Sequence, residues 1–178
     1  LQYVVGYPYG CVEQTTSRLL PMYLLRKNAA LLDTAVPKGT QIDSYIQAGI
    51  ARLFSMQTTA GGLSFWPGHN RPYPYGSVYA FHFLTLVKNG REYPLPEENF
   101  EALHQYVRNI AMNAGGASEA DYYVRAYALY VLTLGGDLDA IQQIQRFDNV
   151  ELPTHGRYLL AAALTTATQD KERVKLYL

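Results

Sequence analysis

The chain alternates two kinds of predicted helix, and this alternation limits the folds open to it. The second, fourth and sixth helices each have one apolar and one polar face, as a half-buried helix does. The first, third, fifth and seventh are apolar nearly all round, which is typical of enclosed helices. Apolar periodicity, interrupted by loops rich in Gly, Pro and Asn, predicts helices over residues 13–32, 40–57, 74–89, 97–113, 119–134, 137–147, 155–168 and from about 170.

Alternating enclosed and half-exposed helices are what two concentric layers require. The sequence therefore predicts an all-α fold built from helical hairpins, closed as an α/α-toroid or open as a solenoid. An irregular helical bundle is the alternative. No convincing pair of strands is present. The predicted helices are fewer than a closed toroid needs, so we expect an incomplete one. The chain does not begin with Met, and we expect it to be part of a larger protein.

Composition restricts the partners of the chain. Its 178 residues suffice for a single domain, 1–178, with a sizeable core. Lys and Arg number 15, as do Asp and Glu. This balance, with no basic stripe, predicts neither nucleic-acid binding nor direct contact with a membrane. No apolar run is long enough to span a bilayer.

One long segment interrupts the helical pattern. Residues 58–76 (TTAGGLSFWPGHNRPYPYG) contain the only tryptophan, several other aromatic residues and three prolines. Loops of this length in compact domains are usually functional or disordered, and the aromatic content argues against disorder. We expect the segment to pack as a structured cover.

The only cysteine of the chain, Cys11, stands three residues before Gln14 in the sequence YGCVEQ. Residues three apart are neighbours on a helical turn, so the thiol can meet the carboxamide. Loss of ammonia from this pair would leave an internal thioester. A buried cysteine without chemistry is the ordinary alternative.

A cysteine-protease role is less consistent with the sequence. It would need a histidine in reach of the thiol, and nothing around the candidates resembles a protease signature. Glu13, an acid close to the thiol in sequence, disfavours a permanently activated thiolate. The histidines also show no metal-ligand spacing, so we expect neither a metal nor a cofactor. The candidates are His69, His82, His104 and His155.

The sequence Gly10-Cys11-Val12-Glu13-Gln14, followed by Pro21 and an apolar helix, resembles the thioester motif of the alpha-2-macroglobulin and complement family. Residues 7–10 (YPYG) and 15–18 (TTSR) are similar to its bacterial branch. Gln57 and residues 61–67 (GGLSFWP) resemble the Gly-Gly and aromatic loop of the family's thioester domain. Residues 75–90 and 122–136 resemble its third and fifth helices, so the likeness covers essentially the whole chain.

This resemblance implies an α/α-toroid thioester domain, of which the chain would be the N-terminal two-thirds. It implies a peptidase inhibitor with a single-use reactive group rather than an enzyme. A target peptidase cleaves a bait region elsewhere in the protein and uncovers the thioester. A lysine amine of the peptidase then attacks the carbonyl of Gln14, and Cys11 leaves. Neighbouring domains of the full-length protein are the other partners, and the bacterial branch implies the periplasm or cell envelope.

A stored thioester must be kept from water until it is used, because a wet thioester hydrolyses. Aromatic residues near the motif and in the long loop are candidates for a shield, although each could equally be an ordinary core residue. The proposed shielding residues are Tyr7, Tyr9, Phe65, Trp66, Tyr73 and Tyr75.

One departure from the complement-like members concerns the nucleophile that accepts the acyl group. Those members carry a catalytic histidine before the fifth helix, whereas residues 109–119 (NIAMNAGGASE) contain none. The departure predicts direct aminolysis with a preference for amines and no catalytic residue. His104 is a weak candidate, more simply interpreted as a residue on the polar face of the fourth helix.

Two other functions remain open from the sequence. An α/α-toroid enzyme of the prenyltransferase or terpene-cyclase type would need an acid-rich or zinc-binding cavity, and only scattered acids such as Asp121 are present. A non-reactive interaction module is the second. A mass lower by one ammonia, without a titratable thiol, would distinguish the thioester from both.

Overall fold

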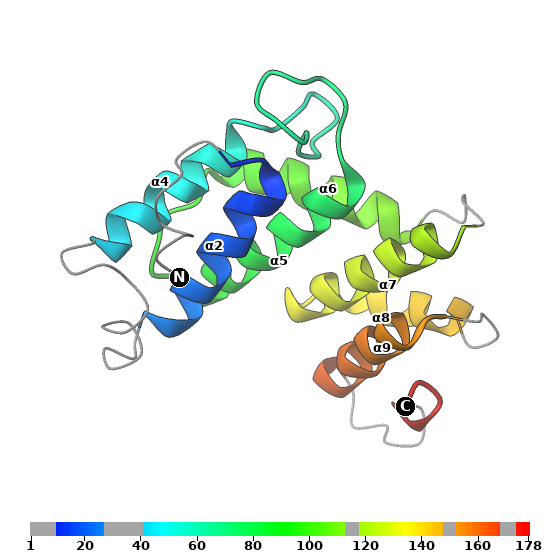
Figure 1. The fold of residues 1–178 in the computed structure, drawn as a ribbon. Coiled ribbons are helices and arrows are strands. Elements are labelled where there is room, and N and C mark those ends of the chain that lie inside the picture. The colour runs from blue at the N-terminus through cyan, green and yellow to red at the C-terminus, as the bar shows by residue number, and fades with distance from the viewer. Residues whose placement is uncertain (1–9, 27–40, 113–117, 148–151, 168–173) are drawn as a thin grey trace.

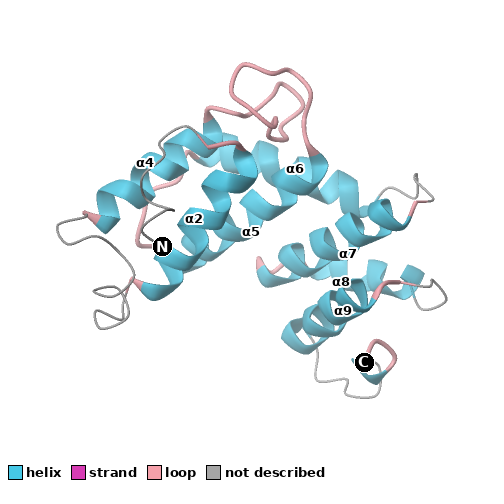
Figure 2. Ribbon diagram, in the orientation of Figure 1, coloured by secondary structure: helices cyan, strands magenta, loops and turns pink. Residues whose placement is uncertain are grey.

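The structure is a computed structural model that describes residues 10–26, 41–112, 118–147, 152–167 and 174–178. Within these ranges every regular element is helical, and the only extended pairing is two isolated bridges, Gln57 with Leu63 and Ser64 with Pro72 (Figure 2). The predicted all-α class is confirmed. The elements are α2 (Val12–Leu25), α4 (Ile42–Phe54), α5 (Pro74–Gly90), α6 (Glu97–Met112), α7 (Glu119–Leu134), α8 (Leu138–Ile144), the 3-10 turn η1 (Gln145–Phe147) and α9 (Thr154–Ala167).

Local sequence signals account for several helix ends. Pro74 begins α5, where its missing N–H costs nothing. Ser118 caps α7 by accepting from the backbone N–H of Asp121, and Asp137 caps α8 in the same way. The part of the first predicted helix after residue 26 lies outside the described residues. Of the predicted last helix, residues 174–178 form one short helical turn.

The helices pack in two layers (Figure 1). One layer runs α2, α5, α7, α9, each in contact with the next. In the second layer α4 packs on α2, α6 packs on α5 and α7, and α8 packs on α7 and α9 as well as on α6. The first layer consists of the helices predicted to be enclosed, and the second of those predicted to be amphipathic. Closure of the layers into a toroid stays a prediction.

The amphipathic helices bury one face as predicted. On α6 the buried residues are Phe100, Leu103, Val107 and Ala111, spaced three or four apart. None of the described helices is long and apolar enough to cross a membrane.

The prediction that the apolar helices are buried all round is wrong for α2 and α9. Leu24 on α2 is 59% exposed and Tyr158 on α9 is 54% exposed. Each helix of the first layer contacts its neighbours in that layer and is covered on one side by the second layer. Its opposite side is not covered by any other described helix. The apolar composition of these helices therefore predicts more burial than their uncovered side has.

A glycine lies at the contact between α4 and α2. Gly49 on α4 faces Leu19 on α2, and a Cβ atom at Gly49 would lie 2.3 Å from Cδ2 of Leu19. Leu19 is 1% exposed and belongs to the core, so a Cβ atom at Gly49 would displace a core side chain.

Replacing Gly49 with Ala should therefore destabilise the chain by about 1–3 kcal/mol through overpacking, although Ala favours a helix by about 1 kcal/mol over Gly. In a Leu19→Ala background the clash is gone, and the same substitution should be neutral or stabilising. Urea unfolding of the four members of this double-mutant cycle measures both effects. An equal cost of Gly49→Ala in both backgrounds would contradict the predicted contact.

Candidate functional site

Cys11 and Gln14 meet at the start of α2. Cys11 is the N-cap residue, has extended backbone angles and is 4% exposed. The side chain of Gln14 folds back over it, and its Oε1 accepts a hydrogen bond from the backbone N–H of Cys11 at 3.1 Å. This is the capping-box arrangement, in which the third helical residue satisfies the N-cap. The carboxamide of Gln14 is thereby held next to the residue that carries the thiol.

The two members of the pair differ in accessibility. The Cys11 side chain belongs to the buried set, whereas Gln14 is exposed. Solvent therefore has access to the Gln14 side of the pair but hardly to Cys11. This is a suitable geometry for an acyl group with a buried leaving atom.

Gly10 lies directly before the pair and has little space around it. Its carbonyl accepts from the guanidinium of Arg52 on α4 and from the hydroxyl of Thr15, each at 3.3 Å. An added Cβ would lie 3.1 Å from Cβ of Gln14 and 3.2 Å from Oγ1 of Thr15. A larger residue here would push against the Gln14 side chain.

The aromatic loop is attached directly to this helix start. The backbone N–H of Val12 donates to the carbonyl of Phe65 at 3.1 Å, which satisfies one of the free donors in the first turn of α2. The loop is ordered by its own bonds. The carboxamide nitrogen of Gln57 donates to the carbonyls of Gly61 and Asn99 at 2.9 and 2.8 Å. Gly61 has φ 86°, and a Cβ there would lie 2.4 Å from the carbonyl oxygen of Ala102.

The predicted shielding residues that are described lie together. The rings of Phe65 and Trp66 are 6.0 Å apart, those of Phe65 and Tyr73 5.5 Å, and those of Tyr73 and Tyr75 6.3 Å. Phe65 is 39% exposed, and the other three are half-buried. Tyr7 and Tyr9, the remaining predicted members, lie outside the described residues. A shielding role for these six stays a prediction.

Glu13, which the sequence marked only as part of the motif, has a partner from the far end of the loop. The hydroxyl of Tyr73 donates to Oε1 of Glu13 at 2.7 Å. Burial, together with the hydrogen bond and the charge of Glu13, raises the pKa of Tyr73 to about 12. The phenol therefore stays protonated and keeps donating to the carboxylate throughout the physiological range.

A row of aromatic rings continues from this point along the first layer, and sequence reasoning missed it. Tyr75 contacts Tyr79 on α5 and the rings of Tyr123 and Tyr127 on α7. Tyr123 in turn meets the imidazole of His155 on α9 at 4.5 Å. The signal was available, because Tyr75 and Tyr79, like Tyr123 and Tyr127, are four residues apart and share a helical face.

His82 lies half-buried within this row. Its Nδ1 lies 2.9 Å from the hydroxyl of Tyr127, and burial lowers its pKa to about 4. The contacts of His82 are with α7, and those of His155 are with Tyr123. No hydrogen bond in the described part of the chain joins a histidine to Cys11. The geometry therefore provides no cysteine–histidine pair.

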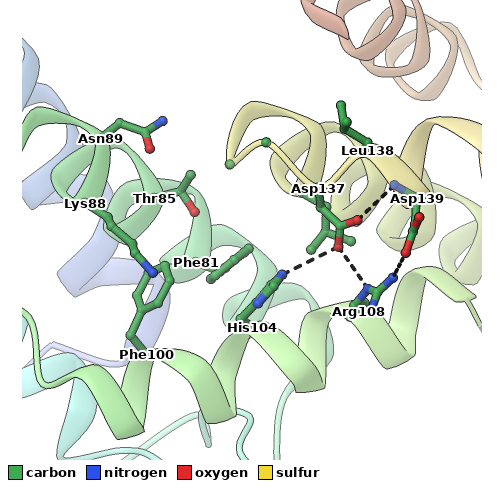
Figure 3. A pocket seen from close by; sticks show the side chains of 13 residues that line it. Phe81, Thr85, Lys88, Asn89, Phe100, His104, Arg108, Asp137, Leu138 and Asp139 are labelled. Carbon is green, nitrogen blue, oxygen red and sulfur yellow. Dashed lines mark hydrogen bonds and ion pairs between the residues drawn. The ribbon is translucent and has the colours of Figure 1, made fainter.

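His104 lies in a separate pocket of about 520 Å³ formed by α5, α6 and the turn between α7 and α8 (Figure 3). Its ring stacks on Phe81 at 5.6 Å, and its nitrogens lie 3.5 Å from Glu101 and 3.6 Å from Asp137. Asp137 also pairs with Arg108 at 2.9 Å. These contacts give His104 a role in packing α6 against the α7–α8 turn, and none of them involves α2.

Within the described ranges, no group of three or more His, Cys, Asp and Glu residues is placed to hold a metal ion. The site thus consists of a thiol, a carboxamide, a carboxylate and the phenol that binds the carboxylate. The fold and this site define a class of protein: an all-helical, two-layered domain that carries a cysteine–glutamine pair at the buried start of a helix.

Comparison with known sequences relates the chain to a protein family. A scan against protein-family models found no match. Curated alpha-2-macroglobulins do match: that of Escherichia coli K12 is 30% identical over 202 residues, covering 96% of this chain and 12% of its own length. The alpha-2-macroglobulin homolog of Yersinia pestis is 28% identical over 140 residues, covering 77% and 7%. The chain therefore spans only 7 to 12% of the length of these relatives.

Solved structures that resemble this chain are of the same family. Native E. coli alpha-2-macroglobulin, from domain MG7 to the C-terminus, superposes with a TM-score of 0.81 at 26% identity, over 98% of this chain and 29% of that one. Salmonella alpha-2-macroglobulin reacted with methylamine gives a TM-score of 0.80 at 25% identity, over 98% of this chain and 12% of that one. These matches identify the chain as a homologue of one region of the bacterial alpha-2-macroglobulins.

The half-buried His82 makes the fold sensitive to acid. Its folded pKa is lowered from 6.5 to about 4, so between these values the unfolded chain binds a proton that the folded chain does not. Stability should fall as the pH falls through this window, by an amount on the order of 3 kcal/mol.

A His82→Gln variant should lose this component of the pH dependence, because glutamine does not titrate. The exposed His69, changed to Gln, is the matched control and should leave the dependence unchanged. The free energy of unfolding, measured across the window for all three proteins, provides the comparison. Equal slopes for the wild type and His82→Gln would show that His82 is not the responsible group.

Proposed function

We propose that Cys11 and Gln14 form an internal thioester in the full-length protein, and that this bond captures attacking peptidases covalently. The observation that carries the proposal is the fold-back of Gln14, whose Oε1 accepts from the N–H of Cys11 at 3.1 Å. It holds the acyl group and the thiol on one helical turn. Cys11 is also the only cysteine of the chain, so no disulfide within the chain competes for it.

The chemistry balances within the pair. The sulfur of Cys11 forms a bond to the side-chain carbonyl carbon of Gln14, and ammonia leaves. When an amine later attacks the same carbon, its nitrogen forms an amide, the carbon–sulfur bond breaks, and Cys11 takes up the proton that the nitrogen loses. Gln14 is thus the acyl donor and Cys11 the leaving group, and the reaction occurs once per molecule.

Two features support storage of the bond until it is needed. Cys11 is 4% exposed, and the loop that carries Phe65 is bonded to the N–H of Val12. Water must be kept from a thioester before its use. Because Gln14 is exposed in this chain, we propose that neighbouring domains of the full-length protein complete the cover that this loop begins. Cleavage of a bait region in another part of the protein would release it.

The relatives support the peptidase as a partner. The similar structures include E. coli alpha-2-macroglobulin activated by trypsin, at 26% identity and a TM-score of 0.78, and the same protein activated by porcine elastase. For this chain, peptidase capture through lysine amines, and a location in the periplasm or cell envelope, are parts of the proposal.

Direct aminolysis is the expected route. Residues 109–119 contain no histidine, and His104 is engaged by Phe81, Glu101 and Asp137. A Salmonella relative has been reacted with methylamine, which fits an amine acceptor. Poor reaction with hydroxyl compounds such as glycerol is the corresponding expectation.

Intact mass spectrometry of the full-length protein tests the bond. The native protein should be lighter than its sequence by one ammonia and should have no titratable thiol at Cys11. Methylamine should add one molecule and free one thiol. A mass that matches the sequence, with a free thiol in freshly prepared native protein, would favour a non-reactive module.

Variants of the pair test the geometry. Gln14→Asn withdraws the carbonyl by one methylene and should abolish both the mass loss and covalent capture of trypsin, as should Cys11→Ala. Gly10→Ala should reduce the fraction of protein that holds the bond, because its Cβ would press on Gln14. Leu24→Ala, at an exposed position farther along the same helix, is the control that should behave as the wild type. Capture is measured on denaturing gels, and capture by Cys11→Ala would contradict the thioester.

A further inference from the structure

The peptide group between Gly10 and Cys11 has hydrogen bonds at both of its ends. Its N–H donates to Oε1 of Gln14 at 3.1 Å. Its carbonyl oxygen accepts from the guanidinium of Arg52 and from the hydroxyl of Thr15, each at 3.3 Å. Because a peptide group is planar, the two donors on the oxygen also help to hold the direction in which the N–H points.

The atom that receives this N–H is the one on which charge develops in the proposed reaction. When ammonia leaves the carboxamide of Gln14, the nitrogen departs and Oε1 stays as the carbonyl oxygen of the thioester. An amine that attacks the carbonyl carbon pushes an electron pair onto this oxygen. A backbone N–H within hydrogen-bond distance of such an oxygen acts as an oxyanion-hole donor, and the N–H of Cys11 is in this position.

The charged donor at the other end of the peptide group comes from a different helix. Arg52 belongs to α4, which packs on α2, and it is half-buried. Gly10 is buried and Thr15 is 8% exposed, so water screens these bonds poorly. A positive charge at the carbonyl oxygen draws electron density toward that oxygen and makes the N–H of the same peptide group a stronger donor.

The other surroundings of Arg52 do not account for a charge at this place. Among the residues that the structure describes, it forms no ion pair, its Nε is buried without a hydrogen-bond partner, and the carbonyl of Gly10 is its one acceptor. It borders a pocket of about 220 Å³ between α2 and α4, whose walls include Leu19, Tyr45 and Ala48. Since partial burial of an ion costs free energy, the bond to Gly10 is the interaction that gives this charge a purpose.

We infer that the N–H of Cys11 is the oxyanion-hole donor of the acyl transfer, and that Arg52 is a positioning residue that strengthens this donor through the peptide group. The inference rests on the proposed thioester and adds the group that activates its carbonyl. The amine nitrogen bonds to the side-chain carbonyl carbon of Gln14, and the electron pair moves to Oε1. When the carbonyl forms again, the carbon–sulfur bond breaks, and the sulfur of Cys11 takes up the proton that the nitrogen loses.

Arg52→Met tests the inference, because methionine keeps a long side chain beside the apolar walls of the pocket but has neither a charge nor a donor. Thiol release from the full-length variant by methylamine should be about 5-fold slower than from the wild type. Spontaneous hydrolysis should slow by a similar factor, since water attacks the same carbonyl. A merely structural role of Arg52 predicts the opposite sign, because a loosened site admits water and amine faster.

Conservative variants and a matched control complete the series. Arg52→Lys keeps the positive charge and should recover part of the lost rate. Thr15→Val removes the second donor without changing the shape of the side chain and should slow the reaction by about 2-fold, whereas Thr15→Ser should react as the wild type. Arg157→Ala removes an exposed arginine of α9, a helix that packs on α7 and α8, and should keep the wild-type rate.

The carbonyl stretching frequency of the thioester reports the hydrogen bond directly. Isotope-edited infrared difference spectra of protein with labelled glutamine, recorded before and after methylamine, isolate this band. In Arg52→Met and in Thr15→Val the band should move to higher frequency, because a weaker hydrogen bond leaves the carbonyl with more double-bond character. In Arg157→Ala it should not move.

The outcomes distinguish the inference from the function on which it rests. A wild type with the full mass of its sequence and no thiol release by methylamine would overturn the proposed thioester. An intact thioester in Arg52→Met that reacts as fast as the wild type or faster, with an unshifted band, would overturn the role of the peptide group and leave the thioester in place. If Arg52→Met does not hold the bond, an unchanged rate and band in Thr15→Val would overturn the inference equally.

Discussion

The start of α2 is the point on which the site depends, because a helix N-terminus leaves backbone donors without partners inside the helix. Here the side chain of Gln14 satisfies the N–H of Cys11, and the carbonyl of Phe65 satisfies the N–H of Val12. The same two bonds that cap the helix place the carboxamide over the cysteine and bring the aromatic loop to it. Helix capping and site assembly are therefore one structural event.

Close backbone approaches hold the surroundings of this helix end in place. Gly49 admits Leu19 between α4 and α2, and Gly61 lets the loop lie on the backbone of α6 at Ala102. Gly76, at the start of α5, has no room for a Cβ beside Val12 and Tyr73. The loop is thus fixed on both α6 and the start of α2, where α4 and α5 also make contacts.

Much of this was predictable from sequence, because it depends on local periodicity. The helices and their assignment to two layers follow from the spacing of apolar residues, and the Cys11–Gln14 pair follows from a separation of three residues. The prediction failed for Leu24 and Tyr158, because an apolar helix indicates which residues avoid water but not whether a neighbour covers them. The grouping of Phe65, Trp66, Tyr73 and Tyr75 was expected from their position in one loop.

The sequence by itself determined the helical class, the spacing of Cys11 and Gln14, and the absence of a histidine in residues 109–119. Only the tertiary structure decided that Tyr73 binds Glu13 across a separation of 60 residues, that His82 pairs with Tyr127, and that His104 belongs to a different pocket. The physical reason is one of range. Helical spacing is fixed by neighbours within a turn, whereas contacts between helices depend on how side chains from distant segments fill the space between them.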